Sequence, residues 1–263
     1  MSTLLYDTPG PKARRRSQIL SALSILVILL LLAWAGFSLD KAGMLAPDLW
    51  ATVFQPDLLN LLAGGLLATF EVSAVAIIMS VVLGALVTAG LMTRSVLLRA
   101  ALRTWVEVFR GLPLLLLIFF LFLGGPVIGV DISTFWALVL GLVLYNSAVL
   151  AEIFRAGIDT LPKGQGEAGL AIGLSNAEVF CIILLPQSIR RMLPTLLTQL
   201  ITLLKETSFG FVIGYAELLR DARTAVEYLG GSYSLPVYTL VAVVYMVINC
   251  ILSEIARRAQ AVL

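Results

Sequence analysis

Six long apolar stretches limit what this chain of 263 residues can fold into. A helix of about 20 apolar residues crosses the ~30 Å hydrocarbon core of a bilayer. Stretches of roughly that length lie at 18–37, 66–91, 104–124, 134–154, 192–215 and 236–253. Only 13% of the residues are charged, about half the share found in soluble domains. The sequence therefore predicts an all-α polytopic membrane protein with six transmembrane helices.

The positive residues predict how these spans are oriented. Lys and Arg accumulate in short cytoplasmic loops, and thirteen of the eighteen lie on one side if the N-terminus is inside. The opposite side holds Lys41, Arg220 and Arg223, while Arg110 and Lys205 fall within spans. We therefore expect a multi-pass protein with both termini in the cytoplasm.

The first apolar stretch has two interpretations. Arg14, Arg15 and Arg16 precede it, and Ala33-Trp34-Ala35 resembles a signal-peptide cleavage site. The apolar run from Ile19 to Phe37 exceeds the core of about 7 to 15 residues that signal peptides have, which favours a retained span.

The residue types exclude several classes of function. With no histidine, the chain has no His-based acid–base catalysis and no His-ligated metal. Two cysteines, Cys181 and Cys250, cannot form a four-ligand metal site, and we expect them to be buried or lipid-facing. A net charge of +2 without a basic stripe argues against nucleic acid as a partner. The sequence contains no cluster of nucleophile, base and oxyanion donors, which argues against a membrane-embedded enzyme.

Two segments carry signals of close packing. Ala76, Ser80, Gly84 and Thr88 recur every four residues, which predicts a face where another helix approaches closely. The loop at 156–194 is too long for a hairpin connection. Pro162, Glu167 and Gly173 outline a short helix, and Ser175 with Glu178 forms a capping box before a second short helix that Pro186 should end. We expect Pro194 to kink or terminate the helix that follows.

The loop also carries the strongest resemblance in the chain. GQGEAGLAIGLSNAEVFCIILLPQSIRRMLP at 164–194 resembles the EAA loop of bacterial ABC importer permeases of the polar amino acid branch. EVFRGLPLLLLIFFLFLG at 107–124, YNSAVLAEIFRAGI at 145–158 and LLKETSFGFVIG at 203–214 resemble further stretches of that branch, in the same order. The departures, Gly169 for Ala, Leu112 for Thr, and Glu206 and Phe209 in the last motif, are mild. The resemblance covers roughly residues 58–258.

This resemblance implies a type I importer fold, with a five-helix permease domain at 58–258. Residues 1–57 add a basic N-terminus, one further helix and an outside loop, and 259–263 form a tail. The resemblance also implies three kinds of partner. These are two ABC ATPase subunits, a second permease chain that is identical or homologous, and an extracytoplasmic substrate-binding protein. The substrate would be an amino acid and the location the bacterial inner membrane. The sequence has no G-x-x-x-x-G-K-[ST] loop, so we expect no cofactor in this chain, with ATP and Mg²⁺ bound by the ATPase.

The loop would then couple the ATPase to the spans. Its small residues let a partner surface come close, and a charge could set the register; a merely compact interhelical loop is the alternative. The expected coupling residues are Gly164, Gln165, Glu167, Ala168, Gly169 and Gly173.

Polar groups within spans are candidates for the translocation path, because such groups are costly at membrane depth. They are Glu107, Arg110, Asn146, Lys205, Glu206 and Thr207. Lys205 and Glu206 should point apart, and Arg110 could pair with Glu206 across spans. The alternative is that these groups only hold spans together. A stand-alone secondary transporter or channel is the alternative function, and its loop would have no ATPase to meet.

Overall fold

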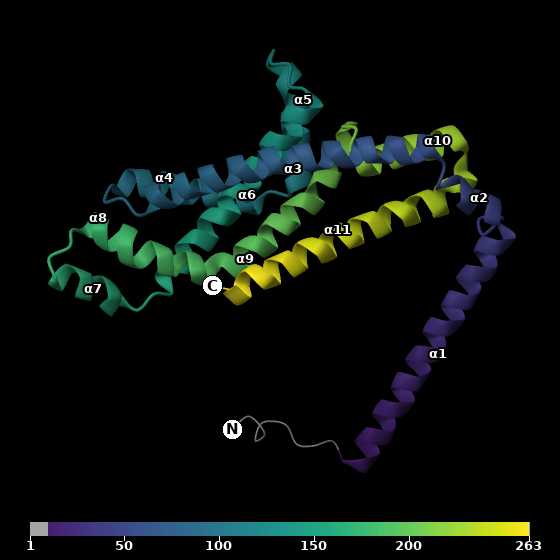
Figure 1. Cartoon of the computed structure of the whole chain (residues 1–263), viewed down its shortest axis with the longest axis horizontal. Helices are drawn as coiled ribbons and strands as arrows, with labels where there is room; N and C mark the ends of the chain where they lie inside the picture. Colours follow the sequence, from purple (N-terminus) through teal and green to yellow (C-terminus); the bar gives the residue numbers. More distant parts are fainter. Residues whose placement is uncertain (1–9, 263) are drawn as a thin grey trace.

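The computed structural model describes residues 10–262, and within them the chain is helical with no strand. Figure 1 shows a bundle of long helices from which the N-terminal helix extends away. The helices are α1 (Pro11–Lys41), α2 (Pro47–Thr52), α3 (Pro56–Leu91), α4 (Val96–Gly111), α5 (Leu114–Val127), α6 (Thr134–Asp159), α7 (Lys163–Ala171), α8 (Asn176–Glu178), α9 (Leu185–Glu206), α10 (Leu218–Leu229) and α11 (Ser234–Val262). A π-helix at Val179–Leu184 and 3₁₀ helices at Thr207–Ile213 and Gly231–Tyr233 join them.

The prediction of an all-α protein with six spans is confirmed. Five helical stretches are each long and apolar enough to cross a membrane: Lys12–Lys41, Pro56–Leu91, Thr134–Asp159, Asn176–Ile213 and Gly231–Gln260. The sixth is the pair α4 and α5, which qualifies only as a bent unit. The basic N-terminus expected before the first span lies partly outside the described residues. Of the tail at 259–263, residues up to 262 continue α11 as helix and Leu263 also lies outside them.

The prediction of a single helix over 104–124 is wrong. α4 ends at Gly111, α5 begins at Leu114, and the two are bent by 99°. Proline disfavours helical geometry in the residue before it, and Leu112 is extended, with φ −81° and ψ 136°. The break therefore follows from Pro113.

The expected helix end at Pro186 is also wrong, and Pro194 does not terminate its helix. Pro186 lies in the first turn of α9, directly after the π-helix, so the chain stays helical from Asn176 to Ile213. Inside a helix a proline lacks an N–H donor and its ring crowds the carbonyl group one turn earlier; here the wider turns of a π-helix precede it. Pro194 lies inside α9, which continues to Glu206.

The contact between α3 and α6 forms the centre of the bundle, as the small-residue spacing predicts. Ala76 and Ser80 are fully buried on α3. A Cβ atom on Gly84 would lie 3.0 Å from the Leu150 Cβ and from the Ser147 carbonyl oxygen. Thr88 Oγ1 donates to the Ala151 carbonyl oxygen at 3.1 Å. Small residues therefore let the two backbones approach each other closely.

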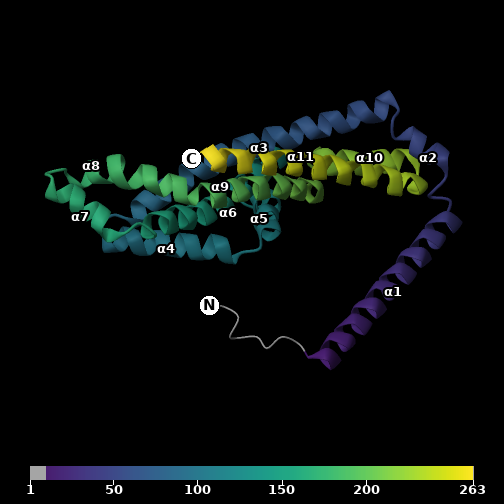
Figure 2. The same ribbon diagram turned by 60° about the horizontal axis from the view of Figure 1, so that its bottom comes forward.

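α1 remains apart from this bundle. None of the residues in its apolar window is buried, and Figures 1 and 2 both show it leading away from the other helices. Large apolar side chains such as Leu29 and Leu32 are about 60% exposed. Since exposed leucines favour hydrocarbon over water, these side chains agree with a span that faces lipid.

The segment between the predicted spans at 192–215 and 236–253 contains α10. Leu218, Ala222 and Ala225 recur at helical spacing, and all three are buried against α3 and α11. α10 lies at the end of the bundle opposite α7 (Figure 1). The two ends of the bundle are thus built from different short helices.

Candidate functional site

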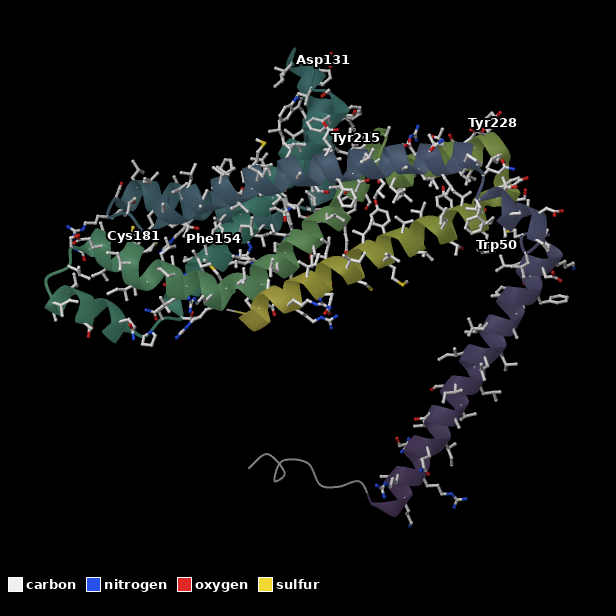
Figure 3. All side chains as sticks on the ribbon, viewed as in Figure 1. Trp50, Asp131, Phe154, Cys181, Tyr215 and Tyr228 are labelled. Carbon is white, nitrogen blue, oxygen red and sulfur yellow. The ribbon has the colours of Figure 1, made fainter. Side chains whose placement is uncertain are left out.

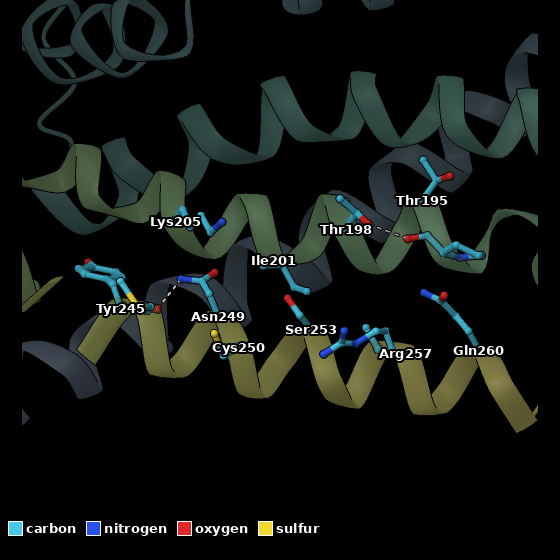
Figure 4. A pocket seen from close by; sticks show the side chains of 13 residues that line it. Thr195, Thr198, Ile201, Lys205, Tyr245, Asn249, Cys250, Ser253, Arg257 and Gln260 are labelled. Atoms are coloured by element: carbon cyan, nitrogen blue, oxygen red, sulfur yellow. Dashed lines mark hydrogen bonds between the residues drawn. The ribbon is translucent and has the colours of Figure 1, made fainter. Parts of the chain in front are cut away.

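A groove of about 870 Å³ runs between α9 and α11 (Figure 4). Its polar side chains come from both helices: Thr195, Thr198 and Lys205 from α9, and Asn249, Ser253, Arg257 and Gln260 from α11. None of the described residues that line it is acidic. Pockets that bind small solutes combine apolar walls with a few polar groups, and this groove has that character.

The two cations of the groove differ in their surroundings. Arg257 Nη2 lies 2.8 Å from Glu254 Oε2, so its charge is compensated. Lys205 forms no ion pair within residues 10–262. An ammonium group donates hydrogen bonds but accepts none. Lys205 therefore presents an unmatched positive charge to the groove.

Asn249 supplies an unmatched acceptor in the same groove. Its Nδ2 donates to the Tyr245 carbonyl oxygen at 2.6 Å, which fixes the orientation of the amide. Its Oδ1 is buried and has no hydrogen-bond partner among the described residues. A buried unpaired acceptor is costly, so a donor arriving from the groove would be favoured after a small movement of the side chain.

A second polar cluster links α6 to α9. Asn146 is fully buried. Its Nδ2 donates to Glu206 Oε2 at 3.0 Å, and its Oδ1 accepts from Gln199 Nε2 at 2.8 Å. The structure thus brings together two of the predicted path residues. It also places Lys205 and Glu206 on different sides of α9, as expected.

Three predicted path residues lie elsewhere. Arg110 does not pair with Glu206. With Glu107 it lines a cavity of about 390 Å³ beside Glu152 and Arg155, because α4 packs against the second half of α6. Thr207 is fully buried, and its hydroxyl donates to the Leu204 carbonyl oxygen at 2.7 Å. The six candidates therefore fall in separate places, and only Lys205 lines the groove.

The predicted coupling loop forms a protruding helix at the other end of the bundle. α7 covers Lys163–Ala171, and Gly173 ends it with φ +90°, a conformation that favours glycine. The capping box of Ser175 and Glu178 is present, and the second short helix, α8, merges through the π-helix into α9. The predicted pair of helices is confirmed, although the second is not separate.

Five of the six predicted coupling residues face outward. Gly164, Gln165, Glu167, Ala168 and Gly173 are exposed. Gly169 is buried, and a Cβ atom there would lie 2.8 Å from side-chain atoms of Val179 and Ile183. Direct contact of Gly169 with a partner, which the sequence predicts, does not fit this geometry. Gly169 instead lets α7 pack against the π-helix.

The polar residues of α11 and Gln199 are absent from the sequence-based candidates. Asn249, Ser253 and Arg257 recur every four residues, so one face of the last span is polar. Gln199 precedes Glu206 by seven residues, or two helical turns, on the same face of α9. The polar residues of α11 and Gln199 could have been predicted from these spacings.

The helices, the groove and the exposed loop define a multi-pass membrane protein with polar groups placed between its spans. The model of the family described as "binding-protein-dependent transport system inner membrane component" matches residues 80–261. The chain belongs to this family.

Relatives and solved structures agree with this membership. The chain is 36% identical to the "probable glutamine ABC transporter permease protein GlnP" of Bacillus subtilis over 79% of this chain and 95% of that protein. It is 33% identical to the "glutamate transport system permease protein GluD" of Corynebacterium glutamicum, over 80% of this chain and 75% of that protein.

Among solved structures, it is similar to an amino acid ABC transporter crystallised with histidines, with a TM-score of 0.74, 29% identity and coverage of 79% of this chain and 96% of that one. The MetNI methionine ABC transporter shares the fold, with a TM-score of 0.62 and 20% identity over 78% of this chain and 99% of that one.

Proposed function

We propose that this chain is the membrane-spanning permease subunit of an ATP-driven importer for a polar amino acid of the glutamine and glutamate type. The observation that carries the proposal is the groove between α9 and α11, in a chain whose relatives are named as glutamine and glutamate permeases. Lys205 would bind the substrate carboxylate, and Asn249 Oδ1 would accept from its ammonium group. The cluster of Asn146, Gln199 and Glu206 lies beside this path and positions α9 against α6.

ATP hydrolysis is proposed to take place on partner ATPase subunits, which bind ATP and Mg²⁺. α7 would dock on them through the exposed residues of the coupling loop, and ATPase closure would then shift the spans between inward-facing and outward-facing states. A second permease chain and an extracytoplasmic substrate-binding protein complete the proposed complex. The α7 end and both termini would lie in the cytoplasm of a bacterium, with the spans in its inner membrane.

The docking role is tested by reversing one charge on α7. Glu167→Arg keeps α7 folded, because the Glu167 side chain is exposed and the position is helical. A charge reversal within an interface costs affinity through like-charge contacts, so we expect the affinity-tagged variant to lose the ATPase on co-purification. Gly173→Asp is less informative, since its positive φ would strain any side chain.

The matched control is Asp131→Arg, which makes the same exchange on the exposed segment between α5 and α6, far from α7 (Figure 3). It should retain the ATPase. Equal recovery of the ATPase with both variants would reject docking through α7, and no ATPase even with the wild type would favour a stand-alone transporter.

A further inference from the structure

The groove between α9 and α11 ends at Tyr245 on the side of α10. Along α11 its lining extends from Tyr245 to Gln260, about 22 Å at the rise of an α-helix. On α9 it extends from Pro194 to Lys205, so Lys205 and Tyr245 lie at the same end. Tyr245 is therefore placed to close the groove at the end opposite α7.

The hydroxyl of Tyr245 is held by a buried carboxylate. Tyr245 Oη donates to Glu217 Oε2 at 3.1 Å. Glu217 is fully buried, and its carboxylate also accepts from the backbone N–H groups of Leu219, at 2.9 Å, and Arg220, at 2.8 Å. These two N–H groups belong to the first turn of α10. One carboxylate thus caps α10 and fixes the side chain at the end of the groove.

α10 is in turn anchored to α3. The Leu218 N–H donates to Thr69 Oγ1 at 3.2 Å. At Gly65 the two helices are so close that a Cβ atom would lie 2.7 Å from Asp221 Oδ2 and 3.0 Å from the Leu218 Cα. Movement of α10 away from α3 would therefore break the hydrogen bond between Leu218 and Thr69, and movement away from α11 would separate Glu217 from Tyr245.

We propose that Tyr245 and Glu217 form a gate, in which their hydrogen bond closes the α10 end of the groove and its rupture opens the groove to the side opposite α7. This inference rests on the proposed function, in which the groove is the translocation path. Both are positioning residues, since the gate holds α10 and shapes the path without binding the substrate.

The burial of Glu217 gives the gate a pH dependence. Burial raises the pKa of Glu217 to about 7, despite the hydrogen bonds it accepts from Leu219, Arg220 and Tyr245, and the nearby Asp221 raises it further. The pKa of Asp221 is itself raised by burial, although Arg220 lowers it, and burial together with Glu71 and Glu217 raises that of Tyr215. These are the titratable groups around the carboxylate.

The direction of this pH dependence follows from the pKa that Glu217 would have in the open state. There Glu217 would be hydrated and would titrate near the ordinary value of about 4.3. A group with a raised pKa in the closed state stabilises that state fully below its ordinary pKa, and this stabilisation is lost as the pH rises through 7. Opening should therefore become easier as the pH rises from about 4.3 to about 7, and the effect should level off above that.

The native Cys250 provides a probe, since it lines the groove and is exposed. The assembled complex, in a Cys181→Ser background, is treated with a membrane-impermeant maleimide from the side opposite α7. Tyr245→Phe removes only the hydroxyl, and we expect it to raise the labelling rate about tenfold, the effect of one lost hydrogen bond of ~1.4 kcal/mol. Tyr238→Phe, the same change on the same helix, should label like the wild type.

Glu217→Gln supplies a second measurement. The labelling rate of Cys250 rises with pH in every variant, because the thiolate is the reacting form. The wild-type rate divided by the Glu217→Gln rate should therefore be larger at pH 8 than at pH 6, because only the wild type titrates at residue 217. Labelling of Tyr245→Phe at the wild-type rate, or an equal pH profile for the wild type and Glu217→Gln, would overturn the gate. Failure of the proposed path is seen separately, as unchanged amino acid uptake by Lys205→Gln, because the labelling depends on Tyr245 and Glu217 alone.

Discussion

At the scale of single residues, the molecule depends on where small and polar side chains lie. Gly84 permits the close approach of α3 and α6, while Gly64 on the same helix has no atom within 4 Å of the position a Cβ would take. Lys205 presents an unmatched charge to the groove, whereas Glu206, its neighbour in sequence, bonds to Asn146 on the opposite side. Neighbours in sequence thus serve different helix interfaces.

Gly84→Val should destabilise the bundle. Its side chain would meet Leu150 and the Ser147 carbonyl oxygen at or below van der Waals distance, and overpacking of this kind costs about 1–3 kcal/mol. The thermal midpoint of the purified chain, followed by fluorescence-detected size-exclusion chromatography, should fall. Gly64→Val is the matched control and should keep the wild-type midpoint; equal midpoints for the two variants would contradict the close contact.

Lys205→Gln should weaken substrate uptake while the complex still assembles. A hydrogen bond to a charged group contributes about 1.5–3 kcal/mol, and each 1.4 kcal/mol corresponds to tenfold in affinity. We therefore expect the KM for glutamine or glutamate uptake into proteoliposomes to rise at least about tenfold. Lys41→Gln, the same exchange on α1, should leave the KM unchanged, and a normal KM for Lys205→Gln would remove this residue from the path.

At the scale of elements, the prolines and glycines set where helices bend and where they meet. Pro113 breaks the third span by 99°, whereas Pro186 and Pro194 are accommodated within one helical stretch. The difference lies in the residue before each of these three prolines: Leu112 is extended, whereas Leu185 and Leu193 are helical. Gly169 determines how α7 sits on the π-helix.

Gly169→Val should displace α7. The added methyl groups would overlap side-chain atoms of Val179 and Ile183, which lie 2.8 Å from the position of a Cβ. We expect faster proteolytic cleavage in the segment 160–175 and a loss of ATPase co-purification, although residue 169 itself is buried. Gly164→Val, on the same helix with no atom near its Cβ position, should show cleavage like the wild type; cleavage of both variants at the same rate would refute the packing role.

At the scale of the whole molecule, α1 is separate from the packed core. The three clusters of buried apolar residues include none of its side chains, and the family model begins at residue 80. The relatives from Bacillus subtilis and Corynebacterium glutamicum also match about four fifths of the chain. The packed core therefore comprises α3 to α11 together with Val53, which directly follows α2.

Deletion of residues 2–41, which removes α1 alone, should leave this core intact. Because the apolar window of α1 buries no residue against the rest of the chain, its removal costs no packing within the described structure. We expect the shortened chain to elute as a folded species and to co-purify with the ATPase at the level of the full chain. Aggregation of the shortened chain, with the full chain well behaved under the same conditions, would show that α1 contributes to folding.

The sequence by itself determined the helical class, the six spans, the α3 face of small residues and the helical coupling loop. Each of these depends on local chemistry: apolar length, four-residue spacing, and capping residues such as Ser175 and Gly173. The four stretches that resemble ABC importer permeases also indicated the family, because their order along the chain can be read from the sequence.

Tertiary structure alone decided which polar groups meet. Asn146 and Glu206 are sixty positions apart, and only the packing of α6 on α9 brings them to 3.0 Å. The groove needs faces from two helices, and the contact of Tyr245 with Glu217 needs α10, which is not among the six predicted spans. Burial of a polar group is unfavourable unless the group is hydrogen-bonded. Which partner it bonds to depends on distances between helices, and these cannot be read from the spacing of residues along one helix.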